Sequence, residues 1–393
     1  MFRVKMYPAL NGDCFLLQSD SANILFDGGY TSTFEDHLRV DLQDLSNHGR
    51  RLDLLVGTHI DQDHILGLIA FLEENGPTQP RKVIEVDDLW FNSLRCLASQ
   101  LSTPIPKGAI HVVKALARQG FIAASTSPGV NKISARQGST LGALIRRNGY
   151  LWNGGNGGHC IQQHCAPLSL SGDASVQVLG PSQQRLDDLR RFWTSALTMR
   201  GYTGPFGSND DLDEAFEIVC NRAPGSSSSV VKKISAGAEK LLSEVYEPDK
   251  SVTNGSSISV VVTADGARIL LLADAWAEDT VDALKTLQAN GESMLFDAIK
   301  VSHHGSLQNT SPELLGLIDA PIYLISSNGS IHEHPDVEVA RAIVDRPSAF
   351  ERALHFNYAT PASASMKLHV SASGAKFKVH ETSTDWIEIK ATQ

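Results

Sequence analysis

The segment Thr58-His59-Ile60-Asp61-Gln62-Asp63-His64 decides how the rest of the sequence is interpreted. The apolar stretch RLDLLVGTH (51–59) is typical of a buried strand, and ILGLIAFLEENG (65–76) is typical of a short helix that ends at a glycine. Two imidazoles and two carboxylates therefore lie within six residues, on one turn at the end of a strand. They are able to close around one or two metal ions. The alternative is a polar loop in which Asp61 or Asp63 caps the following helix.

Two more groups of metal-binding side chains follow predicted strands downstream. Asp274 ends the segment RILLLAD (268–274), and His303-His304-Gly305 follows AIKVS (298–302). Side chains that follow the strands of an α/β sheet gather at the same edge of the sheet. The recurrence of such residues after strands favours a metal site over a helix cap.

Strand-like and helix-like patterns alternate from 1 to 76 and again from 251, which indicates an α/β architecture. Between approximately 90 and 250 the pattern loosens, and the polar stretch 201–229 predicts a flexible excursion. Residues 367–381 alternate like a final hairpin. We therefore expect a single domain over 1–393 with an inserted or elaborated middle region at approximately 90–250.

The composition is that of a folded globular protein, with 42% hydrophobic and 20% charged residues in a chain of 393. The net charge of -10 argues against nucleic-acid binding by bulk electrostatics. It does not exclude a nucleic-acid substrate, because acidic residues gathered around a cation contribute to the negative sum. No apolar stretch is long enough to span a membrane and no signal peptide is seen, so we expect a cytoplasmic protein with no membrane partner.

The cysteines do not form a recognisable framework. Five of them are scattered through the chain, which is not the pattern of a disulfide-rich secreted protein (Cys14, Cys96, Cys160, Cys165, Cys220). The group His159, Cys160, His164 and Cys165 invites a zinc interpretation, but its spacing matches no standard zinc finger. We expect packed thiols and surface histidines there.

The order of the motifs resembles the metallo-β-lactamase superfamily, and in particular its branch containing the nuclease-like domain of the DNA-uptake protein ComEC. His59, Asp61, Asp63 and His64 match the His-x-Asp-x-Asp-His motif of that branch, in which Asp replaces the middle His of the hydrolytic lactamases. Ala273 stands where the branch usually has Gly. Further similarity lies in GDCFLLQSDSANILFDGG (12–29), NGSSISVVV (254–262), LLLADA (270–275), VSHHGSLQNTSPELL (301–315) and HEHP (332–335). The resemblance implies a four-layer αββα sandwich.

The resemblance also implies a set of metal ligands. One of His303 and His304 belongs to it, and alignment of the His-Gly pair favours His304, with His303 beside the substrate. The third lactamase-type histidine has no match, and Asn254 and Ser257 occupy the nearest position, where they are expected to touch substrate or a metal-bound water. The ligand set is His59, Asp61, Asp63, His64, Asp274 and His304.

Carboxylate-rich ligation shifts the metal preference away from an all-imidazole zinc site. We expect one or two divalent ions, either Zn²⁺ or Mn²⁺, with Mg²⁺ also open. Such an ion lowers the pKa of bound water and produces a hydroxide nucleophile. Asp61 or Asp63 is a candidate to take the proton from the attacking water. His303 or His334 is a candidate to stabilise developing charge or to protonate the leaving oxygen, and Asp27 is expected to orient a ligand histidine.

These features predict a metal-dependent hydrolase that uses a metal-activated water. Its substrate is expected to be a phosphodiester, either a nucleic acid or a small molecule. A second hypothesis is a small-molecule esterase, lactonase or phosphorylcholine-esterase-like hydrolase, which the acidic charge suits better. A third is a subunit of a bacterial defence assembly whose site acts only when a protein partner engages it. A basic groove beside the metals favours nucleic acid, and a small closed pocket favours the esterase.

Overall fold

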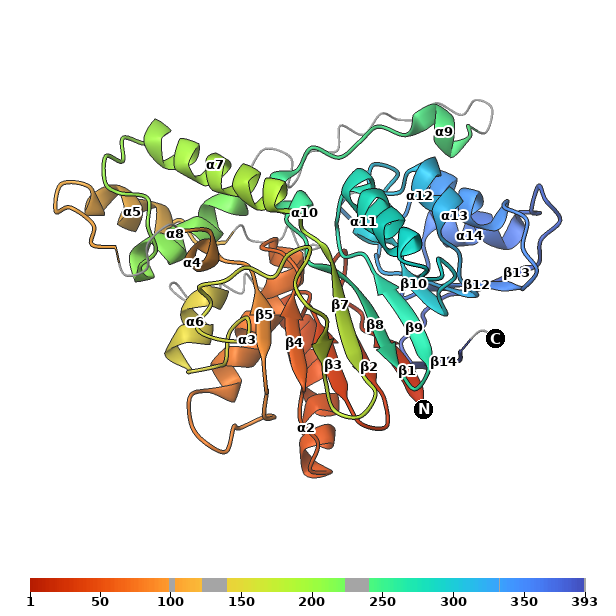
Figure 1. Cartoon of the computed structure of the whole chain (residues 1–393), viewed down its shortest axis with the longest axis horizontal. Helices are drawn as coiled ribbons and strands as arrows, with labels where there is room; N and C mark the ends of the chain where they lie inside the picture. Colours follow the sequence, from red (N-terminus) through yellow and green to blue (C-terminus); the bar gives the residue numbers. More distant parts are fainter. Residues whose placement is uncertain (99–102, 122–139, 223–239, 332, 392–393) are drawn as a thin grey trace.

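Two β-sheets face each other at the centre of the molecule, as Figure 1 shows for the computed structural model. The structure describes residues 1–98, 103–121, 140–222, 240–331 and 333–391. The first sheet runs in the order β14 (Trp386–Ile389), β1 (Phe2–Met6), β2 (Phe15–Gln18), β3 (Asn23–Phe26), β4 (Leu54–Gly57) and β5 (Leu89–Phe91). The second runs in the order β13 (Phe377–His380), β12 (Arg352–Phe356), β11 (Ile322–Ile325), β10 (Ala298–Lys300), β9 (Ala267–Leu271), β8 (Ser259–Ala264), β7 (Ser175–Gly180) and β6 (Leu168–Ser169).

Apolar side chains fill the space between the sheets. Val4, Phe26 and Val56 from the first sheet share one buried cluster with Val260 and Leu271 from the second. The outer faces of both sheets are also apolar, which explains why β3 and β4 are buried at every position rather than at alternate ones. Both outer faces therefore need a covering layer.

Helices supply those covering layers. The first sheet is covered by α1 (Thr31–Thr33), η1 (Phe34–Leu38), α2 (Arg39–Asn47) and α3 (Gln62–Asn75). The second is covered by α11 (Ala277–Ala289), α12 (Pro312–Leu317), α13 (Val337–Val344) and α14 (Pro361–Leu368). The predicted four-layer αββα sandwich is confirmed. Among the described residues, no helix combines the length and the apolar character that crossing a bilayer requires.

The middle region adds further helices. Five of them gather at one end of the first sheet, namely α4 (Leu94–Leu97), α5 (Ile110–Ala117), α6 (Leu141–Arg147), α7 (Gln183–Met199) and α8 (Asp210–Cys220). The short helix α10 (Val252–Gly255) packs against α7, whereas α9 (Leu242–Val245) lies beside α13 and its Leu242 joins the buried cluster of the second sheet. Side chains of α5 to α8 share one hydrophobic cluster with α3. The assignment of the chain to one domain with an insertion at approximately 90–250 stays a prediction.

Two expectations about secondary structure are wrong. Within 201–229 the chain forms α8, because Asn209 caps the helix and Leu212 and Phe216 bury its apolar face; residues 223–229 of that stretch lie outside the described part. Residues 367–381 do not form a hairpin, since α14 continues to Leu368 and β13 pairs in parallel with β12. The alternation near the end of the chain belongs to a half-exposed edge strand.

Candidate metal centre

The predicted ligands meet at one edge of the sandwich, beyond the carboxyl ends of four strands. Asp27 follows β3 and the segment 58–64 follows β4, in the first sheet. Asp274 follows β9, and His303 and His304 follow β10 within the 3-10 turn η2 (Ser302–Gly305), in the second. The site therefore forms only where the two sheets come together.

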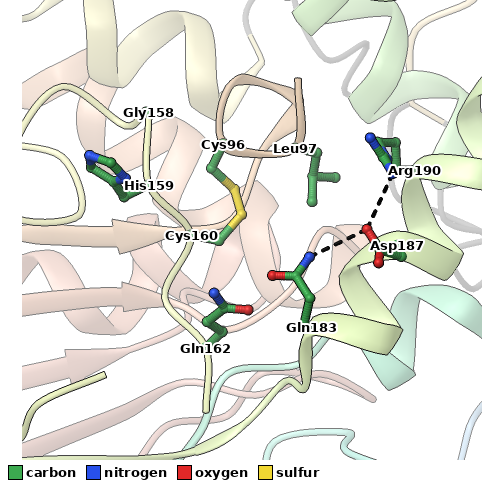
Figure 2. Close-up of a pocket in the computed structure, with 9 residues that line it drawn as sticks. All are labelled: Cys96, Leu97, Gly158, His159, Cys160, Gln162, Gln183, Asp187 and Arg190. Atoms are coloured by element: carbon green, nitrogen blue, oxygen red, sulfur yellow. Dashed lines mark hydrogen bonds and ion pairs between the residues drawn. A yellow bond between two sulfur atoms is a disulfide. The ribbon is translucent and has the colours of Figure 1, made fainter. Parts of the chain in front are cut away.

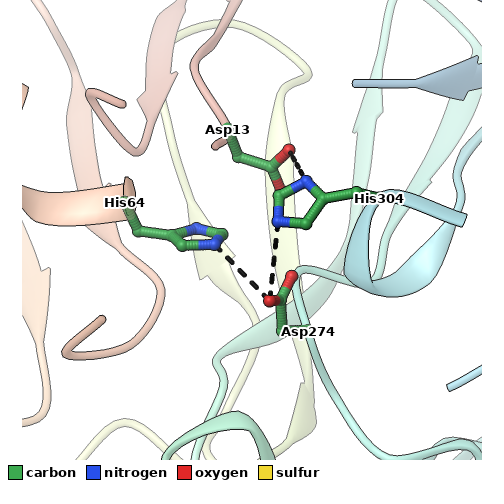
Figure 3. A group of neighbouring side chains, drawn as sticks. All are labelled: Asp13, His64, Asp274 and His304. Atoms are coloured by element: carbon green, nitrogen blue, oxygen red, sulfur yellow. Dashed lines mark ion pairs between the residues drawn. The ribbon is translucent and has the colours of Figure 1, made fainter. Parts of the chain in front are cut away.

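Asp274 lies at the middle of the group. Its Oδ2 is 3.5 Å from Nε2 of His64 and 3.8 Å from Nε2 of His59. The same oxygen is 3.6 Å from Nε2 of His303 and 3.7 Å from Nε2 of His304. Figure 3 shows His64 and His304 approaching this carboxylate from two sides. Four imidazole nitrogens thus converge on one oxygen atom.

Two more carboxylates flank this group. Asp61 Oδ2 lies 3.7 Å from Nε2 of His59, and Asp63 Oδ2 lies 3.9 Å from Nε2 of His304. The structure therefore brings all the predicted ligands together, and His303 with them. We refer to these seven residues as the Asp274 cluster (His59, Asp61, Asp63, His64, Asp274, His303 and His304).

Hydrogen bonds at Nδ1 set the orientation of the ligand histidines. His64 Nδ1 donates to Asp27 Oδ2 at 2.9 Å, and His304 Nδ1 donates to the carbonyl oxygen of Ser326 at 2.9 Å. His59 Nδ1 lies 3.1 Å from Thr58 Oγ1, which itself donates to Asp27. A neutral ring that carries its proton on Nδ1 presents the Nε2 lone pair, which is the form that binds a metal.

The flanking carboxylates are oriented by polar residues from distant segments. Thr253 Oγ1 donates to Asp61 Oδ2 at 3.1 Å, and Asn11 Nδ2 donates to Asp63 Oδ2 at 3.0 Å. Tyr30 in turn donates to the Oδ1 of Asn11. Sequence analysis missed these contacts, because a lone Thr or Asn far along the chain carries no recognisable spacing.

The buried polar atoms of the Asp274 cluster fit a cation. Nε2 of His59, His64 and His304 is buried without a hydrogen-bond partner, as are Oδ1 of Asp61 and Oδ1 of Asp274. Buried polar atoms are rarely left without partners in folded proteins. Carboxylate oxygens and imidazole nitrogens are the usual ligands of divalent first-row metals, so the residues fit one or two such ions.

Asp13 lies close to these residues, but its oxygens are already engaged. One carboxylate oxygen pairs with Lys300 Nζ, and the other accepts a hydrogen bond from Ser326 Oγ and lies 3.2 Å from His304 Nδ1. Burial opposes its ionisation, but Lys300 and His304 outweigh burial and lower the pKa of Asp13. Figure 3 shows Asp13 on the side of the His304 ring that faces away from Asp274. One ligand atom from each of Asp13, His64, Asp274 and His304 lies within 4.8 Å of the others, so Asp13 is also close enough to approach a cation. Its contacts with Lys300 and Ser326 favour a role in orienting His304.

Electrostatic interactions keep Asp274 ionised. Burial alone would raise the pKa of Asp274, but His303, His304 and His64 outweigh burial and hold the pKa well below its usual value. Burial likewise opposes charge on His64, but Asp274 and Asp27 raise the pKa of that histidine well above its usual value. The carboxylate of Asp274 is therefore ionised in the metal-free protein, and the proton on Nε2 of His64 must leave before that nitrogen binds a metal.

The opening motif packs directly against the metal-binding loop. A Cβ at Gly12 would lie 1.9 Å from the carbonyl oxygen of Asp63, and a Cβ at Gly28 would lie 2.4 Å from the amide of Leu68. Ala273 has a φ of 47°, a left-handed conformation that an alanine adopts at a cost. This conformation accounts for the glycine that the resembling branch usually has there.

The remaining predicted residues lie around the cluster. The His334 ring packs edge-on against His303 with centroids 5.3 Å apart, and burial, opposed by Asp336, lowers the pKa of His334. Asn254 Nδ2 donates to Asp249 Oδ2, and Ser257 Oγ is buried without a hydrogen-bond partner. Among the described residues, which do not include His332, no hydrogen bond joins the Ser257 hydroxyl to the Asp274 cluster. The roles assigned to these residues stay predictions.

Asp27→Asn is expected to weaken the binding of one metal ion by about 10–100-fold. Asn keeps the size of the side chain and tolerates the left-handed backbone at this position, where φ is 56°. Its amide nitrogen, however, is a donor and cannot accept the hydrogen bond from Nδ1 of His64. Titration of the chelator-stripped protein with Mn²⁺ measures the effect, and an unchanged affinity would contradict the orienting role of Asp27.

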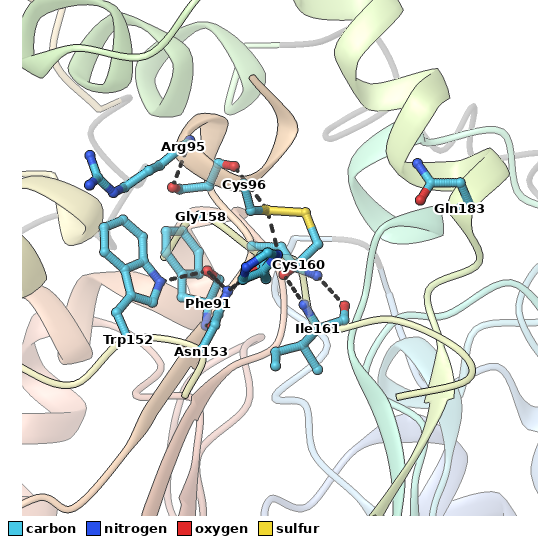
Figure 4. The surroundings of a disulfide bond; sticks show 12 residues. Phe91, Arg95, Cys96, Trp152, Asn153, Gly158, Cys160, Ile161 and Gln183 are labelled. Atoms are coloured by element: carbon cyan, nitrogen blue, oxygen red, sulfur yellow. Dashed lines mark hydrogen bonds between the residues drawn. A yellow bond between two sulfur atoms is a disulfide. The ribbon is translucent and has the colours of Figure 1, made fainter. Parts of the chain in front are cut away.

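A disulfide joins Cys96 to Cys160 (Figure 4), so the expectation of a packed thiol is wrong for Cys160. The pairing has no sequence signature, because the cysteines are 64 residues apart. Asn92 explains it, since its side chain donates to the carbonyl of Ile161 at 2.7 Å and accepts from the Ile161 amide at 2.8 Å. These bonds hold the loop beside α4.

The disulfide borders a cavity of about 240 Å³, which Figure 2 shows between α4, the loop and α7. His159, Gln183 and Arg190 also line this cavity. None of its lining residues belongs to the Asp274 cluster. With Cys160 bonded to Cys96, the group around His159 has lost one of its two thiols as a zinc ligand, and Cys165 keeps the other.

A comparison with protein-family sequence models agrees with this architecture. Residues 7–180 match the sequence model of the metallo-β-lactamase superfamily. No curated protein sequence matches the chain. The metallo-β-lactamase fold protein YhfI from Bacillus subtilis is 10% identical, with 99% of this chain and 100% of YhfI covered and a TM-score of 0.36. CmlA, a diiron β-hydroxylase from Streptomyces venezuelae, is 13% identical, with 98% of this chain and 54% of CmlA covered and a TM-score of 0.37.

Members of the metallo-β-lactamase superfamily are in general metal-dependent hydrolases. The narrower resemblance to the ComEC branch stays a prediction. The sequence match over residues 7–180, together with two facing sheets between helical layers, identifies the fold of this chain as that of the metallo-β-lactamase superfamily.

Proposed function

We propose that this chain is a metal-dependent hydrolase that cleaves phosphodiester bonds. The observation that carries the proposal is the arrangement around Asp274 Oδ2, where four imidazole nitrogens lie within 3.5–3.8 Å and several buried ligand atoms lack partners. The candidate ions are Mn²⁺, Zn²⁺ and Mg²⁺. Divalent ions, when bound, polarise a phosphoryl oxygen and lower the pKa of water toward neutrality.

The predicted ligands divide into two groups, each of which would bind one ion, and Asp274 belongs to both. His59 and Asp61 form one group, because their ligand atoms face each other at 3.7 Å. Asp63, His64 and His304 form the other. Asp27 and Thr58 keep the ligand imidazoles in the form that exposes Nε2. Each group thus combines carboxylate and imidazole ligands, as a two-ion hydrolytic site requires.

Charge favours an anionic substrate. The cluster supplies three carboxylates and four neutral imidazoles, so two divalent ions leave a net charge of +1 on the ligand set. A phosphodiester carries one negative charge and is attracted to such a site even though the whole chain is acidic.

Asp61 and Asp63 are the candidate groups to accept a proton, and they are oriented by Thr253 and Asn11. His334 packs against His303, on the side where substrate is expected.

Hydrolysis assays on the chelator-stripped full chain test the proposal. Mn²⁺, Mg²⁺ or Zn²⁺ is added back in the presence of bis(p-nitrophenyl) phosphate, labelled single- and double-stranded DNA, and RNA. A p-nitrophenyl carboxylic ester and a lactone serve as competing substrates. We expect diester cleavage that needs at least one of the ions. Cleavage of the ester or lactone alone would contradict the proposal and favour the esterase hypothesis.

A complete lack of cleavage by folded protein under every ion would also contradict the proposal. It would favour an enzyme that acts only with a protein partner, in a bacterial defence module for example. Repeating the assay with proteins encoded by neighbouring genes separates that case from an inactive site.

A further inference from the structure

His303 and His304 occupy a strained turn that directs both rings to the same place. Their φ values are 45° and 57°, in the left-handed region, and Gly305 follows with a φ of 83°. Non-glycine residues seldom adopt this region, because the Cβ atom comes too close to the backbone. In a regular strand two successive side chains would point to opposite faces. Here both Nε2 atoms lie within 3.7 Å of Asp274 Oδ2, and such strain is typical of functional sites.

The contacts of His303 fix the position of its proton. Asn309 Nδ2 donates to Asp249 Oδ2 at 2.9 Å and to the carbonyl oxygen of Asp274 at 3.0 Å, which determines the orientation of the amide. Asn309 Oδ1 therefore faces His303 Nδ1 at 2.7 Å and accepts its proton. A neutral His303 ring then presents an Nε2 lone pair to the carboxylate of Asp274. Two lone pairs facing each other repel unless a proton or a metal cation lies between them.

We propose that His303 is a metal ligand through Nε2, in addition to His304, and that it takes the place of the missing third histidine. The inference rests on the proposed function, since it specifies the metal centre of that same site. The group formed by Asp63, His64, His304 and Asp274 already provides four ligands. The group formed by His59, Asp61 and Asp274 provides three, and His303 brings it to four.

We assign His303 to the ion held by His59 and Asp61 because of its contact with α10. Asn254 Nδ2 lies 3.5 Å from His303 Nδ1, and Thr253, the residue before it, donates to Asp61 Oδ2. The ring of His303 therefore packs beside α10, the same short helix that orients Asp61. His303 is 18% exposed at its side chain, so it leaves the ion accessible to substrate.

Metal titration of the full chain tests this assignment without any substrate. The chelator-stripped wild type and His303→Asn are titrated with Mn²⁺ and with Zn²⁺, and bound equivalents are counted by mass spectrometry after gel filtration. Asn tolerates the left-handed backbone but does not reach Asp274. We expect two equivalents in the wild type, and in His303→Asn a loss of affinity of at least about 100-fold for one of them. His334→Gln, which changes the neighbouring ring, is expected to keep both.

Two outcomes would overturn the inference. Two ions bound with unchanged affinity by His303→Asn would place His303 beside the substrate instead. A wild type that binds no ion would overturn the proposed function as well, which distinguishes the two failures. Circular dichroism of the metal-free proteins checks folding. If His303→Asn fails to fold, Asn309→Leu replaces it, because this variant removes the group that accepts the Nδ1 proton of His303. We expect it to lower the affinity for the same ion by about 10–100-fold. Unchanged binding would again overturn the inference.

Discussion

Asp274→Asn is expected to lose both metal ions and nearly all hydrolytic activity. The substitution keeps the shape of the side chain but removes the negative charge on which four imidazole nitrogens converge. If the shared carboxylate contributes about 5 kcal/mol to transition-state stabilisation through the ions it holds, kcat/KM falls by about 10⁴-fold. Metal equivalents and phosphodiester hydrolysis are measured on the same preparation.

Asp173→Asn is the matched control for this prediction, because it makes the same chemical change at an exposed turn far from the cluster in sequence. It is expected to retain metal and activity. If Asp274→Asn instead keeps two equivalents of metal and wild-type activity, Asp274 is not the shared ligand.

Lys300→Met is expected to reduce the free energy of unfolding by about 3–5 kcal/mol, because it leaves a buried carboxylate without its cation. Lys300 is only 1% exposed, pairs with Asp13, and donates to the carbonyl oxygen of Ala273 at 2.9 Å. Urea denaturation of the chelator-stripped proteins at neutral pH measures the change. The double variant Asp13→Asn/Lys300→Met is expected to recover much of the loss, because it also removes the unpaired charge.

The pH dependence of this interaction follows from the direction of the shift. Lys300 and His304 lower the pKa of Asp13 in the folded protein, so the ion pair stabilises the fold above the unfolded pKa of Asp. That stabilisation is lost only as the pH falls through the lower folded value. A loss below 1 kcal/mol in Lys300→Met at neutral pH would contradict the role assigned to the pair.

The sequence predicts the parts of this site that depend on short-range order. His59 to His64, Asp274 and the His303-His304 pair each follow a predicted strand, which favours metal ligation, and the family resemblance implies the ligand set. The left-handed conformation of His303 is set by the packing around η2, so spacing could not show that both histidines face Asp274. The sequence therefore leaves the choice between His303 and His304 open, whereas both rings lie at the carboxylate of Asp274.

The residues that orient the ligands could not be predicted from the sequence. Thr253 is 192 positions from Asp61, and Asn11 is 52 positions from Asp63. The disulfide depends in the same way on contacts between Asn92 and Ile161. Tertiary packing also determines the secondary structure within 201–229, where burial of Phe216 stabilises α8 in a polar stretch.

Anomalous diffraction from crystals soaked in Mn²⁺ tests the central claim, a two-ion centre that shares Asp274, most directly. We predict two anomalous peaks, one for each ion. Asp274 is a ligand of both ions, His59 and Asp61 bind the first, and Asp63, His64 and His304 bind the second. No peak at Asp274, or a single ion that takes Asp13 as a ligand, would contradict the account.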